Sequence, residues 1–456
     1  MDDRQLKAIS RTDGALGNYT KHIQFRGSRG FLRQTRDAQG DRRIAIPPLI
    51  KRNTALLALS LSFSGAGMQF AYGFGPLMVI NLTGSAGLAG LSVGMIGLSR
   101  FLVAYPIGKI TDAYGRKPGI HFGLCLALMG TLTLAVSMQV KSIALFTFGL
   151  LVFGMGMNAS QQMRIAAADM YPPRLRAQAL GFVALGSLLG LVLSPLIVKL
   201  AQIYGDYSGT DPLGIPWLFL PVFIIGGAII VTFIRPDPKE IGMNLQKYYP
   251  EHVPAERHAG GAKSAFSPWK LFRHQNLRIA IISNCAASGN MSIVMVLTSM
   301  VLAHHGHSLV SIALSHMFHS IGMFAFTIPL GRLADRRGRM FVMMPGVATT
   351  LVGAALAAFT SSWLSVTLGT FLVGLGWAAA NVSATAMIAD HVATEERGRA
   401  IGFNDTFAGA TNVFAALVTG PLLEWFGLPA TGLTAVLLAA IPLTLLAMEL
   451  SVRPRR

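Results

Sequence analysis

A run of charged side chains interrupts an apolar part of the chain at residues 331–340, which read GRLADRRGRM. Its charged residues are Arg332, Asp335, Arg336, Arg337 and Arg339. No Asp, Glu, Lys or Arg occurs in residues 279–330 or 340–389, on either side of it. Guanidinium groups stay protonated and form forked hydrogen bonds to carboxylates. The run therefore predicts ion pairs that form and break, and not the cleavage of covalent bonds.

A second copy of this run occurs 223 residues earlier, where residues 108–117 read GKITDAYGRK. The residues common to both copies are Gly108, Asp112, Gly115 and Arg116 in the first and Gly331, Asp335, Gly338 and Arg339 in the second. Lys117 ends the first copy, and Met340 takes its place in the second. Glycine suits a turn with positive φ or a close approach of two helices. Each run predicts a tight turn whose contacts could form in one conformation and break in another.

A longer pair of segments repeats at nearly the same offset, residues 153–182 and 373–403. The matching residues are Gly154, Gly156, Asp169, Arg176 and Gly181 in the first and Gly374, Gly376, Asp390, Arg397 and Gly402 in the second, which carries one inserted residue. Two independent features at nearly one offset make chance similarity a poor explanation. The chain is interpreted as an internal duplication.

Two charged residues lie inside the apolar runs, Arg100 and Asp405. A charge at the centre of a membrane helix costs roughly 2.5–3.5 kcal/mol on insertion scales, so it needs a partner or water. Arg100 precedes Gly108 by eight residues, which places it about 12 Å along a helix from the charged turn. The two could pair with each other, or each could face water separately.

Other polar side chains in the apolar runs are candidates for a substrate or proton site. His316 and His319 are three residues apart, so they share one helix face. Histidine titrates near neutral pH and could carry a proton, although a buried, hydrogen-bonded histidine is the common alternative. The remaining candidates are Gln69, Tyr72, Asn158, Gln161, Gln162, Arg164, Asn284, Asn290 and Asn381. Hydrogen bonds between helices are the alternative role for these residues. No metal site is expected.

The elements that must position these residues are predicted to be membrane-spanning helices. Of the 456 residues, 52% are hydrophobic and 13% are charged, whereas soluble proteins have roughly 25% charged residues. A helix needs about 20 apolar residues to cross a bilayer, and backbone groups in lipid must be satisfied within the segment. The predicted spans are 54–80, 87–107, 118–138, 142–163, 177–201, 213–234, 276–302, 308–330, 340–360, 363–388, 400–423 and 428–450.

The distribution of charge predicts the orientation of these spans. The net charge is +18, and residues 1–53 carry twelve Lys and Arg against five Asp and Glu. Basic residues gather in alternate loops, which is the positive-inside pattern and places both termini in the cytoplasm. Nucleic-acid binding is not indicated. The predicted domains are a basic tail, a six-helix bundle, a cytoplasmic loop, a second six-helix bundle and a short tail, over residues 1–53, 54–234, 235–275, 276–450 and 451–456.

With these motifs in place, the chain resembles the major facilitator superfamily over about residues 50–452. The family pattern G-x-L-x-D-R-x-G-R-K lies between helices 2 and 3 and again between helices 8 and 9. Here Ile110 replaces Leu and Ala113 replaces Arg in the first copy, and Met340 replaces the last Lys in the second.

The resemblance implies an all-α membrane protein of twelve helices in two pseudo-symmetric six-helix bundles. The substrate site would lie in a central cavity near the bilayer midplane, lined by helices 1, 4, 7 and 10. The turns would belong to gating networks with the acidic end of helix 4 and its counterpart. Those positions are Asp169, Arg176, Asp390 and Arg397. Helices 2 and 11 would face each other, so we expect Arg100 and Asp405 to pair when the cytoplasmic side is closed.

The expected function is secondary transport by alternating access in the inner membrane, with protons as the coupling ion and a monomeric protein. No enzyme activity and no cofactor are expected. The residues Gly181, Gly190 and Pro195 partly match the family's antiporter pattern, with Ser194 in place of a glycine, which favours export of a small organic compound or drug. Leu150 stands where related exporters often have an arginine. Uptake of a small organic solute is the alternative, and a non-transporting receptor or assembly factor is the alternative from another class.

Overall fold

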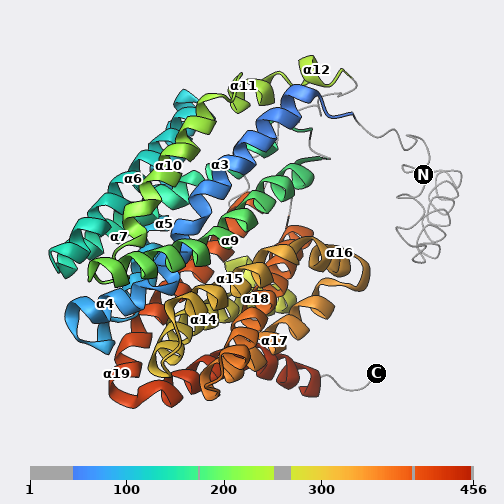
Figure 1. Cartoon of the computed structure of the whole chain (residues 1–456). Helices are drawn as coiled ribbons and strands as arrows, with labels where there is room; N and C mark the ends of the chain where they lie inside the picture. Colours follow the sequence, from blue (N-terminus) through green and yellow to red (C-terminus); the bar gives the residue numbers. More distant parts are fainter. Residues whose placement is uncertain (1–44, 173–174, 251–268, 393–395, 453–456) are drawn as a thin grey trace, which may run out of the picture. The chain divides into compact units, whose positions relative to one another are not determined.

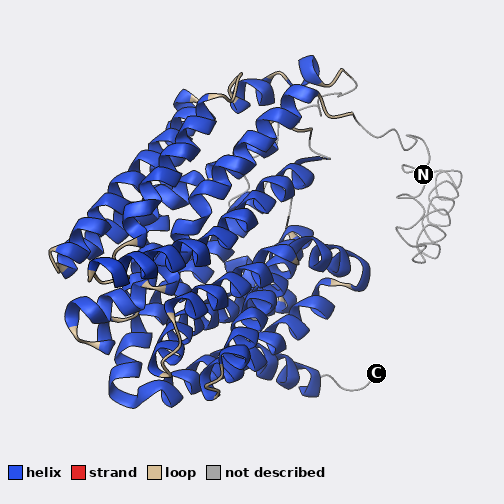
Figure 2. Cartoon of the chain, viewed as in Figure 1, coloured by secondary structure: helices blue, strands red, loops and turns tan. Residues whose placement is uncertain are grey.

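The computed structural model describes residues 45–172, 175–250, 269–392 and 396–452. Residues from Pro48 onward form one compact unit, which contains all the helices named below. The described residues of this unit are helical and contain no strand (Figure 2).

The first half of the unit comprises, in its described residues, eight α-helices and a short 3-10 helix (Figure 1). They are α3 (Pro48–Gly73), α4 (Gly75–Thr83), η1 (Ala86–Leu88), α5 (Leu91–Tyr114), α6 (Arg116–Gln139), α7 (Ile143–Ser160), α8 (Gln162–Asp169), α9 (Arg176–Ser208) and α10 (Pro216–Thr232). The described residues between the halves form short helices, which are α11 (Pro238–Met243), α12 (Leu245–Tyr248) and α13 (Trp269–Arg273). The second half comprises α14 (Gln275–His304), α15 (Leu309–Ala325), α16 (Thr327–Arg337), α17 (Arg339–Phe359), α18 (Trp363–His391) and α19 (Arg397–Val452).

Ten helical stretches in the described residues are long and apolar enough to cross a membrane. One of these stretches belongs to α19, a 56-residue helix that contains the non-helical residue Gly427 with φ 77° and ψ −178°. The apolar helix α10 is shorter, at 17 residues. A multi-pass helical membrane protein is therefore confirmed, and the count of twelve spans stays a prediction.

Three predicted spans are broken in the structure. The span 54–80 divides between α3 and α4 at Phe74, and the span 308–330 divides between α15 and α16 at Phe326. Pro76 and Pro329 lie just after these breaks. Each proline lacks the N–H that would bond to the carbonyl four residues earlier, so the helix cannot continue regularly through that point. The span 142–163 divides at Gln161 with no proline nearby.

The duplication in sequence is also a duplication in packing. A methyl group on Gly156 of α7 would lie 2.1 Å from a backbone nitrogen of α6, and one on the matching Gly376 of α18 would lie 2.4 Å from a backbone oxygen of α17. Real Cβ atoms essentially never come closer than 3.0 Å to such atoms. The two glycines therefore let α7 rest directly on α6, and α18 directly on α17, in the same way in each half.

Candidate functional site: twin charged turns and the interface between the halves

Each charged run forms the turn between two long helices. Gly115 joins α5 to α6 with φ 104°, and Gly338 joins α16 to α17 with φ 107°. Both angles lie in the region that glycine adopts readily and other residues rarely adopt. The sequence therefore places glycine where the backbone reverses, and the following arginine begins the next helix in both copies.

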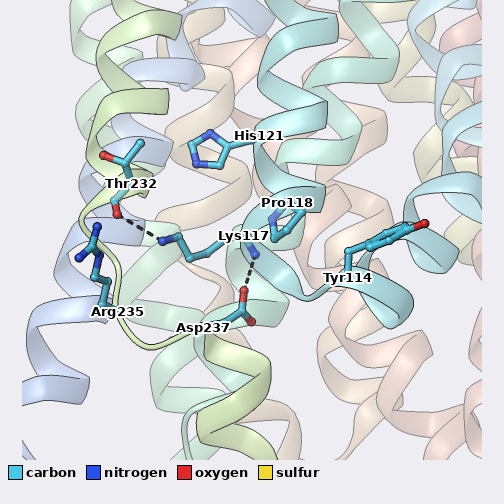
Figure 3. A pocket seen from close by; sticks show the side chains of 7 residues that line it. All are labelled: Tyr114, Lys117, Pro118, His121, Thr232, Arg235 and Asp237. Atoms are coloured by element: carbon cyan, nitrogen blue, oxygen red, sulfur yellow. Dashed lines mark hydrogen bonds between the residues drawn. The ribbon is translucent and has the colours of Figure 1, made fainter.

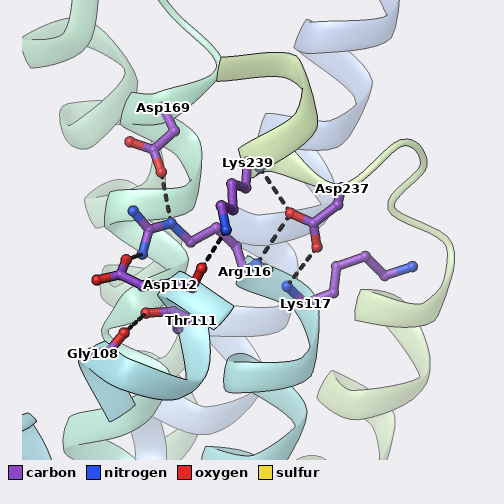
Figure 4. Close-up of polar contacts among 8 residues, drawn as sticks. All are labelled: Gly108, Thr111, Asp112, Arg116, Lys117, Asp169, Asp237 and Lys239. Carbon is purple, nitrogen blue, oxygen red and sulfur yellow. Dashed lines mark hydrogen bonds and ion pairs between the residues drawn. The ribbon is translucent and has the colours of Figure 1, made fainter. Parts of the chain in front are cut away.

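The first turn holds an ion-pair network (Figure 4). The Nε of Arg116 donates to Oδ2 of Asp169, at the end of α8, over 2.7 Å. Its Nη1 lies 3.7 Å from Oδ1 of Asp112, one turn back on α5. Arg116 thus links three helices through one guanidinium group.

The second turn repeats this arrangement. The Nε of Arg339 donates to Oδ2 of Asp390, near the end of α18, over 3.0 Å. Its Nη1 forms an ion pair with Asp335 on α16. The residues that the sequence paired by offset therefore occupy equivalent positions, although a gating role for them stays a prediction.

One member of the first network was missed by sequence reasoning. The Asp237 carboxylate accepts hydrogen bonds from the backbone N–H groups of Arg116, Lys117 and Lys239, at 3.1, 2.9 and 2.8 Å (Figure 4). It thereby caps two helices at once, α6 and α11. The Lys239 side chain also donates to the backbone oxygen of Asp112. An Asp before Pro-Lys-Glu indicates a helix cap, but nothing in the sequence assigns it to α6.

Other residues predicted for the gating motif make local contacts. The Lys117 ammonium donates to the backbone oxygen of Thr232 over 3.2 Å, and Arg176 donates to the backbone oxygen of Tyr171 over 3.4 Å. Gly108 accepts from Thr111, and a methyl group on Gly331 would only touch a side chain of α18 at 3.7 Å. The side chain of Arg397 lies outside the described residues.

The two halves meet through polar and close-packed contacts at the end away from the charged turns. Gln69 on α3 donates to the backbone oxygen of His316 on α15 over 3.0 Å. Ser299 on α14 donates to the backbone oxygen of Gly73 over 2.6 Å. Ser85 donates to the carboxylate of Glu424 on α19 over 3.0 Å.

Glycines bring η1 and the residue before α5 into backbone contact with α19 at this same end. A methyl group on Gly90 would lie 1.7 Å from the backbone oxygen of Ala416, and one on Gly420 would lie 2.0 Å from the backbone oxygen of Gly87. Further along, Gly94 faces Leu417, and Phe101 touches Gly409. The contacts between these helices thus proceed from the interface end towards the charged turns.

The contacts between the halves become sparse nearer the charged turns. Gly181 on α9 faces Ile328 on α16, where a methyl group would lie 3.2 Å from the side chain. Among the residues that the structure describes, no hydrogen bond or ion pair joins residues 108–117 to residues 331–340. The hydrogen bonds and backbone contacts that join the halves in the described residues therefore gather towards one end of the interface.

The two predicted histidines have a defined hydrogen-bond pattern. Ser299 has one hydroxyl hydrogen, which it donates to Gly73, so the Nε2–H of His316 must donate to Ser299 over 2.8 Å. The Nδ1–H of His319 donates to the backbone oxygen of Thr370 over 2.8 Å. The other ring nitrogen of each histidine, Nδ1 of His316 and Nε2 of His319, is buried and has no partner among the described residues.

Most of the remaining polar candidates join helices to each other. The amide of Asn158 donates to Ser99 and to the backbone oxygen of Gly154. Asn381 donates to Asn284 over 3.2 Å. Asn290 donates to the backbone oxygen of Ala435 over 2.7 Å. The structure gives Tyr72 and Gln162 no hydrogen bond to another described residue. Whether any of these side chains contacts a substrate stays a prediction.

Three charged side chains lie close to residues of the other half, and these are Arg100, Arg164 and Asp405. Arg100 and Asp405 are close enough to interact electrostatically, but they do not form an ion pair within 4.0 Å. The guanidinium carbon of Arg164 on α8 lies 5.4 Å from the ring centre of Phe324 on α15, in the other half. Its Nη2 donates to Ser187 over 3.3 Å, and its Nε is buried without a partner among the described residues. Arg164 therefore keeps an unused donor at the interface.

Comparisons with known proteins agree with this architecture. The family model described as Major Facilitator Superfamily matches residues 57–323 and 279–456. The uncharacterized MFS-type transporter YdeG of Bacillus subtilis is 25% identical over 386 residues, which cover 82% of this chain and 86% of that protein. The riboflavin transporter RfnT of Brucella anthropi is 24% identical, with 83% and 90% covered. The sialic acid transporter NanX of Escherichia coli is 25% identical, with 82% and 88% covered.

Solved structures share the fold at lower sequence identity. The crystal structure of the nucleoside transporter NupG aligns with a TM-score of 0.61 and 13% identity, covering 89% of this chain and 99% of that one. The human organic anion transporter MFSD10 aligns with a TM-score of 0.58 and 18% identity, covering 88% of this chain and all of that one.

Proposed function

This chain belongs to the Major Facilitator Superfamily, and on that premise we propose that it carries a small organic compound across a membrane by alternating access. The observation that carries this proposal is the one-ended interface. The halves touch closely at Gly90 and Gly73, while the twin charged turns are not joined to each other in the described residues. A transporter that opens alternately to its two sides requires such a state and its reverse.

The charged turns mark the side that is open in this state. Basic residues favour the cytoplasmic side of a membrane; the first run has two lysines and one arginine, and the second has four arginines. We place the turns in the cytoplasm of the cell that makes the protein, in its inner membrane. We therefore assign this state as inward-open, and we propose that closure of the cytoplasmic side brings Arg100 closer to Asp405.

Arg164 is the residue that we assign to substrate contact. It is a permanent cation on the face of α8 that lies towards α15, and its Nε has no partner among the described residues. A charged group so placed needs an anion or water. A substrate with an acidic or strongly hydrogen-bonding oxygen would supply that partner.

We assign proton coupling to the histidine pair. His316 and His319 each have one buried ring nitrogen with a free lone pair, as their hydrogen-bond patterns require. His316 also contacts the first half through its backbone oxygen, which accepts from Gln69. A proton on this imidazole would therefore act directly at the closed interface, where it could favour opening. Export would follow if this proton binds from the outer side and is released to the cytoplasm in exchange for the substrate.

Export is the direction that the residues Gly181, Gly190 and Pro195 favour, but this support is weaker. Helix α9 contains the antiporter-like pattern, but its Gly190 lies against the backbone of α3, where a methyl group would be 2.3 Å from the oxygen of Ser62. Close packing of two helices accounts for this glycine equally well.

The test uses purified full-length protein in oriented proteoliposomes with an imposed pH gradient. A panel of labelled compounds is screened for proton-driven movement, and each active compound is tested on Arg164→Gln with Arg273→Gln, at an exposed arginine on α13, as the matched control. We expect the unmodified protein to show proton flux when the substrate is added. We expect transport to be lost in Arg164→Gln but kept in the control variant. Movement without any proton flux would overturn the coupling, and equal activity of the two variants would overturn the role of Arg164.

A further inference from the structure

A groove runs along the outer side of the first half, between α6 and α10, and begins at the charged turn (Figure 3). Its first part is a cavity of about 470 Å³ with polar and basic lining. The residues that matter there are Tyr114, Lys117, His121, Thr232, Arg235 and Asp237. None of these residues belongs to the interface between the halves.

A second cavity of about 220 Å³ continues the groove along the same two helices. It shares His121 and Thr232 with the first, and its other lining residues are apolar or sulfur-containing. Lys117, His121 and Cys125 are spaced four residues apart, so they follow one face of α6. From Lys117 to Leu128 this face is about 16 Å long at 1.5 Å per residue. The groove therefore has a basic end and a long apolar end.

The acidic residue in the basic end is already engaged. The Asp237 carboxylate accepts hydrogen bonds from three backbone N–H groups, at the starts of α6 and α11. The basic residues are engaged less. Lys117 makes one side-chain hydrogen bond, to Thr232, and the side chains of Arg235 and His121 make none to any described residue. Lys117 and Arg235 are also close enough to repel each other electrostatically, and Asp237 offsets part of this repulsion by attracting Lys117.

An anion between Lys117 and Arg235 would remove this repulsion and use their free donors. The apolar part of the groove decides what kind of anion fits. Ile225 and Ile229 on α10 are 45% and 53% exposed, so this part is open to the acyl chains around a membrane helix. A free phosphate would use only the basic end. The amino-terminal residues 1–44 carry ten Lys and Arg against five Asp, so their net positive charge does not complement the basic end.

We propose that this groove binds one anionic phospholipid. The phosphate lies between Lys117 and Arg235 beside His121, and an acyl chain lies along α6 and α10 over Leu128 and Ile225. Basic pockets between membrane helices on the cytoplasmic side are suited to such headgroups. The lipid joins α6 to α10 directly beside the Asp237 cap, outside the substrate path.

The experiment measures lipid binding to the full-length protein in detergent by native mass spectrometry. Phosphatidylglycerol is compared with phosphatidylcholine of the same chains, and glycerol 1-phosphate serves as the headgroup without chains. We expect phosphatidylglycerol to bind more tightly than either of the others. Loss of one basic residue near a headgroup weakens binding about fivefold, so Arg235→Gln should bind phosphatidylglycerol about fivefold more weakly.

Two further variants make the result specific. Arg336→Gln removes an exposed arginine at the other charged turn and should leave binding unchanged. Ala228→Trp fills the apolar cavity and should weaken phosphatidylglycerol binding while Arg235 is intact. Equal affinities for the two lipids, or equal effects of Arg235→Gln and Arg336→Gln, would overturn the proposal. Binding of glycerol 1-phosphate as tight as that of phosphatidylglycerol would replace the lipid with a soluble anion and overturn it as well.

Discussion

Gly90 offers the sharpest test of the one-ended interface, because a single methyl group there should open it. In Gly90→Ala, the new Cβ would lie 1.7 Å from the backbone oxygen of Ala416 and 2.7 Å from its carbonyl carbon. Ordinary van der Waals contact begins at 3.4 Å. Both neighbours are backbone atoms, so no side-chain rotation can relieve the clash, and α5 must move away from α19.

The size of the effect follows from the cost of overpacking. Inserting a methyl group into a tightly packed contact costs about 1–3 kcal/mol. This cost applies only to the state in which α5 and α19 touch at this end, since the opposite state separates them. A difference of about 1.4 kcal/mol changes an equilibrium tenfold. We therefore expect Gly90→Ala to shift the population between the two states by about 5-fold to 150-fold, away from the state in the structure.

The assay measures distances between pairs of spin labels on a background in which Cys125 and Cys285 are replaced by serine. One pair, on Leu88→Cys and Phe426→Cys, reports on the closed end. A second pair, on Ala113→Cys and Arg336→Cys, reports on the end of the charged turns.

In Gly90→Ala the first distance should lengthen and the second should shorten. Gly402→Ala is the matched control, because nothing lies within 4 Å of a methyl group at that glycine. Distance distributions that are the same in both variants would refute the reasoning, since the clash would then have been absorbed without movement of the halves.

Three other changes test the first network and the histidines. Asp237→Ala leaves three backbone N–H groups at two helix starts without an acceptor, and should lower the free energy of unfolding by about 1–2 kcal/mol in thermal melts, with Asp206→Ala as a neutral control. Arg116→Gln and Arg339→Gln each remove two ion pairs to carboxylates; transport should fall in both while the amount of protein in the membrane stays the same, and a parallel loss of protein would instead show a structural role. His316→Gln should abolish proton-driven transport but keep exchange of substrate for substrate, and intact proton dependence in that variant would exclude His316 as the carrier.

The sequence predicted the twin turns well, and the reason is physical. A glycine with positive φ between two helices can be recognised in the sequence, because few other residues can replace it. The constant offset between the copies is enough by itself to match Arg116 with Arg339. The offset also matched Asp169 with Asp390, but their role as partners of the two arginines was predicted through the resemblance.

Asp237 could not be predicted in the same way. It lies 121 residues after Arg116, and the groups that it binds are backbone N–H groups, which every residue except proline carries. The polar residues within the spans were equally hard to assign, because helices in a membrane have apolar residues on all sides and periodicity does not reveal their facing. Asn158 bonds within its own half to Ser99, and Asn290 bonds to a neighbouring helix at Ala435. No sequence pattern predicts either hydrogen bond.

Because the two charged turns have unequal surroundings, their ion pairs should respond differently to ionic strength. Salt weakens attraction between exposed charges far more than between sheltered ones. The side chain of Asp169 is 28% exposed, whereas that of its counterpart Asp390 is 51% exposed. The first turn also has the Asp237 cap, which depends on uncharged donors. Raising the salt concentration should therefore weaken the ion pairs of the second turn before those of the first, so the two networks would dissociate in a fixed order.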